Sequence, residues 1–114
     1  MDNISESAIN IIAEGTHVEG KIVFDKISRV HGTLTGEVHA QAGSTLILAE
    51  TSLVEGNISA DTLVIDGFVR GNIEAKTKVI VSGSGRVVGN IKTPSLQIEF
   101  GAYFEGKSFM ESVS

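Results

Sequence analysis

Six glycine-centred units recur along the chain, each reading apolar–x–Gly–x–apolar, as in Val54-Glu55-Gly56-Asn57-Ile58. The last copy departs from this pattern because it ends on Ser108. The repeat glycines, separated by 16, 20, 15, 18 and 17 residues, are Gly20, Gly36, Gly56, Gly71, Gly89 and Gly106. A period of about 17 residues is too short for two helices or a four-stranded propeller blade, whereas one coil of a β-solenoid fits it.

Pairs of alternating apolar residues stand between the glycine units, and a period of two is typical of strands that bury one face. The pairs are Leu46/Leu48, Leu63/Ile65, Val79/Val81 and Leu96/Ile98. A single coil cannot bury such a face, so the coils must stack into one continuous core. We therefore predict an all-β fold, a parallel β-solenoid of about six coils with these pairs inside. The fixed glycine indicates a bend, a bulge or a close backbone approach, among which the sequence does not decide.

Composition excludes several classes of function. The chain has 114 residues, no cysteine, 9 basic and 14 acidic residues, and a formal charge of −5. The lack of cysteine rules out a disulfide framework, thiolate metal sites and cysteine nucleophiles. An acidic surface is a poor binder of phosphate backbones, so we expect no nucleic-acid partner. No apolar run is long enough to span a membrane, and Asp2 and Glu6 stand where a signal peptide needs basic residues. A soluble, intracellular domain is expected.

The repeat resembles that of the bactofilins, a family of bacterial cytoskeletal proteins. The resemblance rests on the Val-x-Gly-Asn-Ile units at 54–58, 69–73 and 87–91 and on the opening run 11–20, and it covers residues 9–108. It implies a right-handed, three-sided parallel β-helix that polymerises into filaments without nucleotide or cofactor. It also implies a scaffold for cell shape and for cell-wall machinery, with the chain itself and cell-wall or morphogenesis proteins as partners. The implied location is cytoplasmic, at the inner face of the membrane through partners.

The expected domain organisation is a β-helical domain at 9–108 between short tails at 1–8 and 109–114. Some bactofilins reach the membrane through an apolar and basic N-terminal segment. Residues 1–8 contain no Lys or Arg here, and anionic lipid would repel Asp2 and Glu6. Direct membrane binding is therefore not expected.

Residues that could carry chemistry are better explained structurally. Residues 79–89 look like a strand and a glycine-rich phosphate loop, but β-branched residues follow where such a loop needs a helix. His17 and His31 could share a face, yet two imidazoles without a third ligand make a poor zinc site, and His39 resembles a solvated surface residue. We expect no enzyme, metal or cofactor. Two alternatives to a scaffold stay open: a solenoid adaptor for one protein partner, and a β-helical enzyme acting on a sugar or acyl donor.

Aromatic residues crowd the last coil. The predicted polymerisation interface consists of Phe100, Tyr103, Phe104, Phe109 and Met110. The end of a solenoid exposes unpaired backbone and an open core, so it must be capped or must pair with another copy. The cluster is therefore either an intermolecular contact or a plug for the chain's own core. With an intermolecular contact, the chain would be a self-assembling cytoskeletal scaffold that polymerises end to end.

Overall fold

The computed structural model describes residues 9–110, all of whose regular elements are strands. The predicted tail at 1–8 and residues 111–114 lie outside this range. The strands are β1 (Ile9–Ile12), β2 (His17–Phe24), β3 (Ile27–Val30), β4 (Thr33–Ala40), β5 (Thr45–Leu48), β6 (Leu53–Ile65), β7 (Phe68–Arg70), β8 (Ile73–Val81), β9 (Arg86–Val88), β10 (Ile91–Lys92), β11 (Leu96–Ile98), β12 (Tyr103–Glu105) and β13 (Ser108–Phe109).

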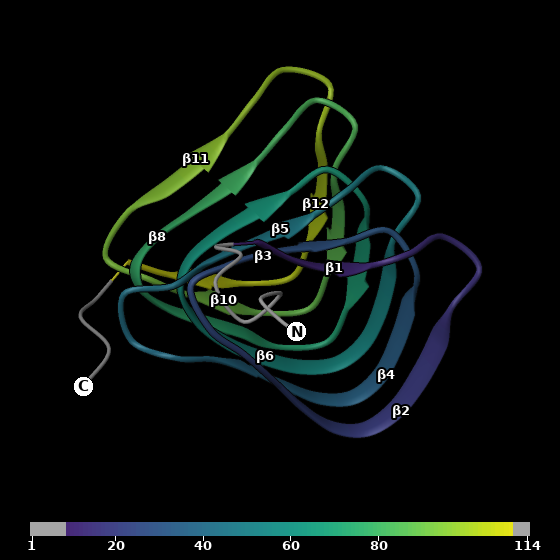
Figure 1. The fold of residues 1–114 in the computed structure, drawn as a ribbon. Coiled ribbons are helices and arrows are strands. Elements are labelled where there is room, and N and C mark those ends of the chain that lie inside the picture. The colour runs from purple at the N-terminus through teal and green to yellow at the C-terminus, as the bar shows by residue number, and fades with distance from the viewer. Residues whose placement is uncertain (1–8, 111–114) are drawn as a thin grey trace.

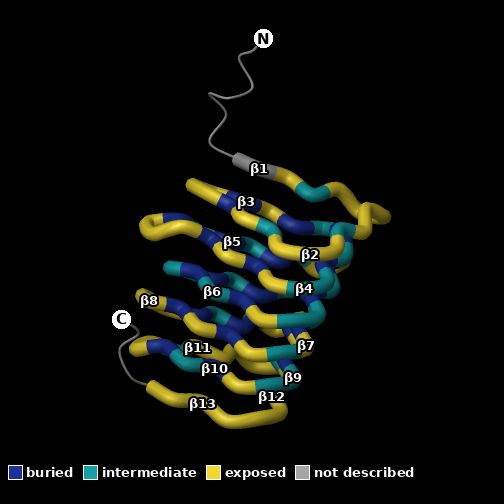
Figure 2. Tube along the Cα trace, turned by 90° about the horizontal axis from the view of Figure 1, so that it is seen from below, coloured by how far each residue is buried: buried dark blue, intermediate teal, exposed yellow. Residues whose placement is uncertain are grey.

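Every strand pairs in parallel with the strand one coil away, which confirms the predicted β-solenoid of about six coils. The chain traces a three-sided outline in Figure 1. From the N-terminal coil it turns clockwise while receding from the viewer, as Figures 1 and 2 together show, so the solenoid is right-handed.

The three sides are named here by their strands. Face A holds the segments before the repeat glycines, including β7, β9 and β12. Face B holds the segments after those glycines, including β10 and β13. Face C holds β1, β3, β5 and β11 with residues 62–65 of β6 and 78–81 of β8. The longest strand, β6, passes through all three faces.

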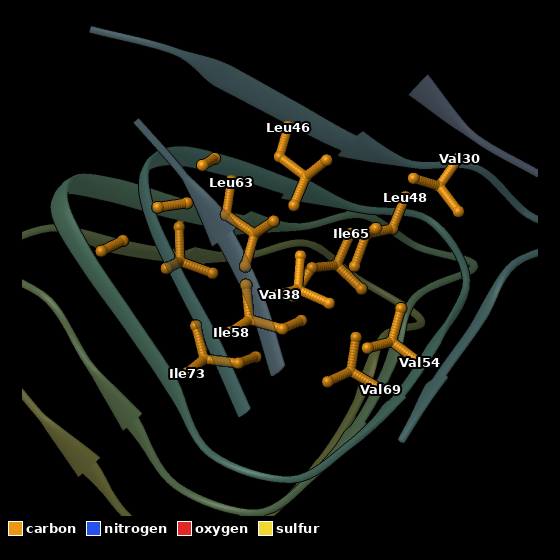
Figure 3. Packing of buried hydrophobic residues seen from close by; sticks show 14 of the residues in the cluster. Val30, Val38, Leu46, Leu48, Val54, Ile58, Leu63, Ile65, Val69 and Ile73 are labelled. Atoms are coloured by element: carbon orange, nitrogen blue, oxygen red, sulfur yellow. The ribbon is translucent and has the colours of Figure 1, made fainter. Parts of the chain in front are cut away.

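The core is a set of columns in which each inward residue stacks on its equivalent in the next coil. Leu46, Leu63 and Val79 form one such column on face C, and all three are buried. Figure 3 shows Leu46 and Leu63 inside the coils together with residues of the other two faces, such as Ile58. Figure 2 shows that buried positions recur from coil to coil. The inward pairs predicted at 46/48, 63/65 and 79/81 are confirmed.

The prediction fails in part for the last pair, Leu96/Ile98. Both residues keep the register of the column, since Leu96 pairs with Val79 and Ile98 with Val81. Leu96 is nevertheless half-buried, and Ile98 is 44% exposed. The reason is position, because these residues lie in the last coil and no further coil of the described chain covers them.

The repeat glycines combine a bend with a close approach. Gly56 and Gly71 have φ angles of 137° and 148°, in the region that favours glycine. A Cβ on Gly71 would lie 1.8 Å from the carbonyl oxygen of Gly56, and a Cβ on Gly56 would lie 1.7 Å from that of Gly36. Two of the three explanations offered by the sequence therefore hold at once.

An asparagine ladder bridges the coils beside these glycines. The Oδ1 atom of Asn57 accepts a hydrogen bond from the backbone N–H of Asn72 at 3.4 Å. In the same way Asn72 accepts from Asn90 at 3.3 Å, and Asn90 accepts from Lys107 at 3.1 Å. In each case a repeat glycine lies in the break between two strands, which are β7 and β8, β9 and β10, and β12 and β13. The ladder therefore supplies side-chain acceptors for backbone donors at the breaks.

Candidate assembly interface

Phe104 occupies an inward position in the last coil. It pairs with Val87, which continues the column formed by Leu34, Val54 and Val69. All four of these residues are fully buried, whereas Phe104 is half-buried and packs against the core from the end. A large ring therefore stands where the repeat elsewhere places an aliphatic residue, and no further coil within the described residues covers it.

The other four predicted interface residues lie around this ring. Tyr103 and Phe109 are about half exposed. Tyr103 stands next to the inward Phe104, and Phe109 stands next to the position that continues the inward column of Ile91. Phe100 is fully exposed in the turn between β11 and β12, and Met110, 57% exposed, follows β13. The structure thus places one of the five residues against the core and four on the rim of the C-terminal coil.

The phenol of Tyr103 is tied to its own coil. Its hydroxyl donates a hydrogen bond to Oε1 of Glu105 at 2.6 Å. This hydrogen bond, together with the negative charge of Glu105, raises the pKa of Tyr103 above its ordinary value. The phenol therefore stays protonated at neutral pH and fixes the Glu105 carboxylate on the rim.

At the opposite end no coil within residues 9–110 covers the first coil, and the sequence did not predict this end as a contact surface. Ile12, Val18 and Ile22 pack against the core but are only half-buried. A Cβ on Gly20 would meet no atom within 4 Å, unlike that on Gly36 in the next coil. The signal was weak because this end carries aliphatic residues like those of every coil, without an excess of aromatic residues.

The two terminal coils carry the same charged tripeptide. Glu19-Gly20-Lys21 stands in the first coil and Glu105-Gly106-Lys107 in the last. All four charged side chains are exposed. The four inner units lack this combination; they read Thr35-Gly36-Glu37, Glu55-Gly56-Asn57, Arg70-Gly71-Asn72 and Val88-Gly89-Asn90. Acid before the glycine and base after it therefore distinguish the two ends from the middle.

The three histidines lie in different places on the solenoid. Nε2 of His17 lies 3.2 Å from Oγ1 of Thr35 and 3.6 Å from Oε2 of Glu19. His31 lies in the link between β3 and β4, and His39 lies on β4. No group of three potential His, Asp or Glu ligands occurs within residues 9–110.

The predicted glycine-rich loop is a turn between two strands. β8 ends at Val81 and β9 begins at Arg86, so a strand follows the glycines and not a helix. The structural explanation of this segment is therefore confirmed.

A surface hollow lies on face B and reaches from Lys21 in the first coil to Glu74 on β8. It measures about 520 Å³, and its polar lining includes Glu37, His39, Ser59 and Glu74. Asn57 and Asn72 also line it, but their Oδ1 atoms belong to the asparagine ladder. Part of the lining is thus committed to holding the coils together.

Comparison with known proteins agrees with this architecture. The family model for bactofilins, described as polymer-forming and cytoskeletal, matches residues 10–108. The chain belongs to the bactofilin family. Bactofilin BacO of Myxococcus xanthus (strain DK1622) is 33% identical over 104 residues, which cover 91% of this chain and 81% of the relative. Bactofilin BacP of the same organism is 30% identical over 103 residues, which cover 90% of this chain and 42% of BacP.

This bactofilin therefore spans less than half the length of BacP. No solved structure matches it. Within the described residues there is no helix of the length and apolar character that a membrane span requires. The resemblance inferred from the glycine units is confirmed, and so is the fold that it implied.

Proposed function

We propose that this bactofilin polymerises through the ends of its solenoid into filaments that need neither nucleotide nor metal. The filaments would act as a scaffold for cell shape or for positioning cell-wall machinery. The single observation that carries the proposal is the uncovered core at the C-terminal coil, where Phe104 and Leu96 are half-buried and Ile98 is exposed. The family's polymer-forming, cytoskeletal character supports it.

Burial of the Phe104 ring against a second subunit would drive much of the association. Covering one large apolar side chain contributes about 1.5–3 kcal/mol. In a two-fold symmetric junction each residue is counted twice, because both copies present the same surface. Tyr103, Phe109, Met110 and Phe100 would then form the rim of the contact.

The terminal charges favour a two-fold junction over head-to-tail stacking. Continuing the parallel register from one subunit to the next would place Glu19 beside Glu105 and Lys21 beside Lys107, about 4.8 Å apart along the axis. A two-fold axis near Gly106 would instead place Glu105 opposite Lys107 of the second copy. Opposite charges then meet twice in each junction, and the same reasoning applies around Gly20.

The substitution Phe104→Arg tests the proposal. It would put a charge into the junction while leaving the inner coils untouched, so we expect soluble monomers or dimers joined through the N-terminal ends. These species should keep the far-UV circular dichroism spectrum and most of the thermal stability. Electron microscopy and sedimentation of the purified protein without nucleotide provide the measurement.

The matched control is Phe68→Arg, which changes a half-buried phenylalanine on the outer side of face A in the middle of the solenoid. It should still form filaments. Normal filaments from Phe104→Arg would rule out this end as the junction. Unfolding would show that the ring is a plug for its own core, and wild-type protein that stays monomeric would favour the adaptor alternative.

A further inference from the structure

The last repeat unit differs from the others at both of its inward positions. The inward columns beside the repeat glycines are Val18, Leu34, Val54, Val69, Val87 and Phe104 on face A, and Ile22, Val38, Ile58, Ile73, Ile91 and Ser108 on face B. The last coil therefore has the largest residue of the face A column and the smallest of the face B column. Phe104 is half-buried and Ser108 is exposed. Both lie at the C-terminal end of the stack, on β12 and β13 (Figure 2).

The two differences are complementary about Gly106. The segment reads Tyr103-Phe104-Glu105-Gly106-Lys107-Ser108-Phe109. Counted outward from the glycine, an acid corresponds to a base, a large inward residue to a small one, and one outward aromatic residue to another. Such a segment matches a second copy of itself that runs in the opposite direction. The first coil lacks this difference in size, because the unit around Gly20 has Val18 and Ile22 at its inward positions.

The backbone of the last coil is suited to this antiparallel contact. The carbonyl oxygens of Glu105, Lys107 and Phe109 accept hydrogen bonds from the preceding coil. Backbone groups of successive residues in a strand point to opposite edges, so those of Phe104 and Ser108 point away from the preceding coil. A two-fold axis at Gly106 sets Phe104 opposite Ser108 of the second copy, where the two residues can exchange both backbone hydrogen bonds. The open edge of the last coil would thereby be paired.

We propose that the ring of Phe104 packs on Ser108 of a second copy, and that this contact of a large residue with a small one makes the C-terminal end specific for itself. The inference rests on the end-to-end, two-fold junction proposed above and names the residues that determine its specificity. On the rim, Tyr103 would face Phe109 of the second copy. Both rings are about half exposed in the single chain, and contacts between aromatic rings would add to the burial of apolar surface.

Two single substitutions should disturb the match in opposite directions. Ser108→Ile would set an isoleucine against the Phe104 ring twice in each junction, and overpacking of this kind is destabilising. Phe104→Val would leave a valine against Ser108 twice, with much less apolar surface buried. We expect each variant alone to raise the critical concentration for polymer by about tenfold or more.

A mixture of the two variants is the decisive measurement. In a mixed two-fold junction, Phe104 of the Ser108→Ile copy meets Ser108 of the Phe104→Val copy, as in the wild type. On the other side of the axis the new valine meets the new isoleucine, and both have the size found in the inner coils. We therefore expect an equimolar mixture to polymerise at a critical concentration within about threefold of that of the wild type. Sedimentation measures the polymer, and thermal unfolding followed by circular dichroism checks that each variant is folded.

The matched controls remove or add the same bulk at other places. Phe68→Val changes a phenylalanine on the outer side of face A, and Ser95→Ile changes an exposed serine next to the inward Leu96 in the last coil. Both variants should polymerise like the wild type. An equal rise in critical concentration for Ser95→Ile would overturn the proposal, because added apolar bulk anywhere in the last coil would then explain the effect of Ser108→Ile.

Three further results would contradict the pairing. A mixture that polymerises no better than the single variants would show that the Phe104 ring fills a space in its own coil. Normal polymer from Ser108→Ile alone would indicate head-to-tail stacking, in which the new isoleucine would meet Ile22. Wild-type protein that stays monomeric would overturn the end-to-end function together with the pairing. If the wild type polymerises, Phe104→Arg prevents it and the mixture fails, the function stands and the pairing is wrong.

Discussion

At the scale of single residues, the repeat glycines show how much of a residue's role can be predicted from the sequence. Their recurrence predicts a position that no other residue fits. A strand bend and a close backbone approach, however, both require glycine there, so the sequence does not distinguish them. The two causes separate only when the register is known, because the clash involves the carbonyl of a glycine 15 to 20 residues earlier. Gly20 shows the difference, since its φ is 112° but nothing lies near its missing Cβ.

Replacing Gly71 by alanine should be among the most destabilising single changes. The new Cβ would need both a φ near 148° and a position 1.8 Å from the Gly56 oxygen. Backbone strain alone costs about 1–3 kcal/mol, so we expect Gly71→Ala to lose more than about 3 kcal/mol of unfolding free energy. Gly43→Ala is the matched control, with a φ of 81° and open space around the Cβ. Equal losses in urea denaturation would show that the close approach relaxes freely.

At the scale of elements, the corner between faces B and C is held by one carboxylate. Asp61 accepts a hydrogen bond from the hydroxyl of Thr77 and another, at 2.6 Å, from the backbone N–H of Gly43. The Thr77 bond is the larger cause, with the Gly43 bond second, and together they hold the pKa of Asp61 below its ordinary value. The long turn at 41–44 is thereby attached to the two coils that follow it.

The stabilisation from Asp61 should therefore depend on pH. A carboxyl whose pKa is lower in the folded state stabilises the fold above its unfolded pKa of about 3.9, and the effect is lost as the pH falls through the folded value. We expect Asp61→Asn to lower the melting temperature at neutral pH and to reduce its fall in acid. Thermal unfolding between pH 7 and pH 3 measures this, with Asp66→Asn on the outer surface as the control. Parallel curves for Asp61→Asn and wild type would contradict it.

The terminal coil offers a test of junction symmetry. In a two-fold junction Glu105→Lys would place two like-charged pairs together, whereas in a head-to-tail junction it would bring a lysine next to Glu19. The first case predicts a critical concentration raised about threefold or more, and the second predicts a lower one. Adding Lys107→Glu to make the double variant should restore the two-fold junction.

Glu105→Gln is the control for the hydrogen bond from Tyr103, since it keeps an acceptor. Light scattering at low and high salt gives the measurement, because screening should reduce the difference between variants. A lower critical concentration for Glu105→Lys alone would exclude the two-fold junction.

Prediction from sequence was best where one coil repeats another. The strands that contain Leu46/Leu48, Leu63/Ile65 and Val79/Val81 follow directly from alternation, and the place of Phe104 follows from its slot in the repeat. The asparagine ladder and the exposure of Ile98 could not be predicted from the sequence, because each depends on which coil lies next to the residue and not on the residue itself. The proposed contact surface at the N-terminal end was missed because its aliphatic residues resemble those of every other coil.

At the scale of the whole molecule, assembly should proceed without any small molecule. The described residues contain no phosphate loop and no cluster of metal ligands, and in the proposed assembly the half-buried core residues of the two terminal coils supply the attraction. Treatment with EDTA and apyrase should leave the amount of pelletable polymer unchanged. A fall in polymer after either treatment, reversed by adding the metal or the nucleotide back, would contradict packing as the sole cause.

Stacking of one coil upon the next also separates two properties that are coupled in most globular proteins, length and surface recognition. A middle coil contacts its two neighbours, so the number of coils fixes how long the subunit is, while in the proposed end-to-end assembly the first and last coils fix what it joins. Removal of residues 57–71, which would connect Gly56 directly to Asn72, would shorten the rod by one coil and leave both ends unaltered. Evolution could in this way change the repeat distance of a polymer without redesigning its joints.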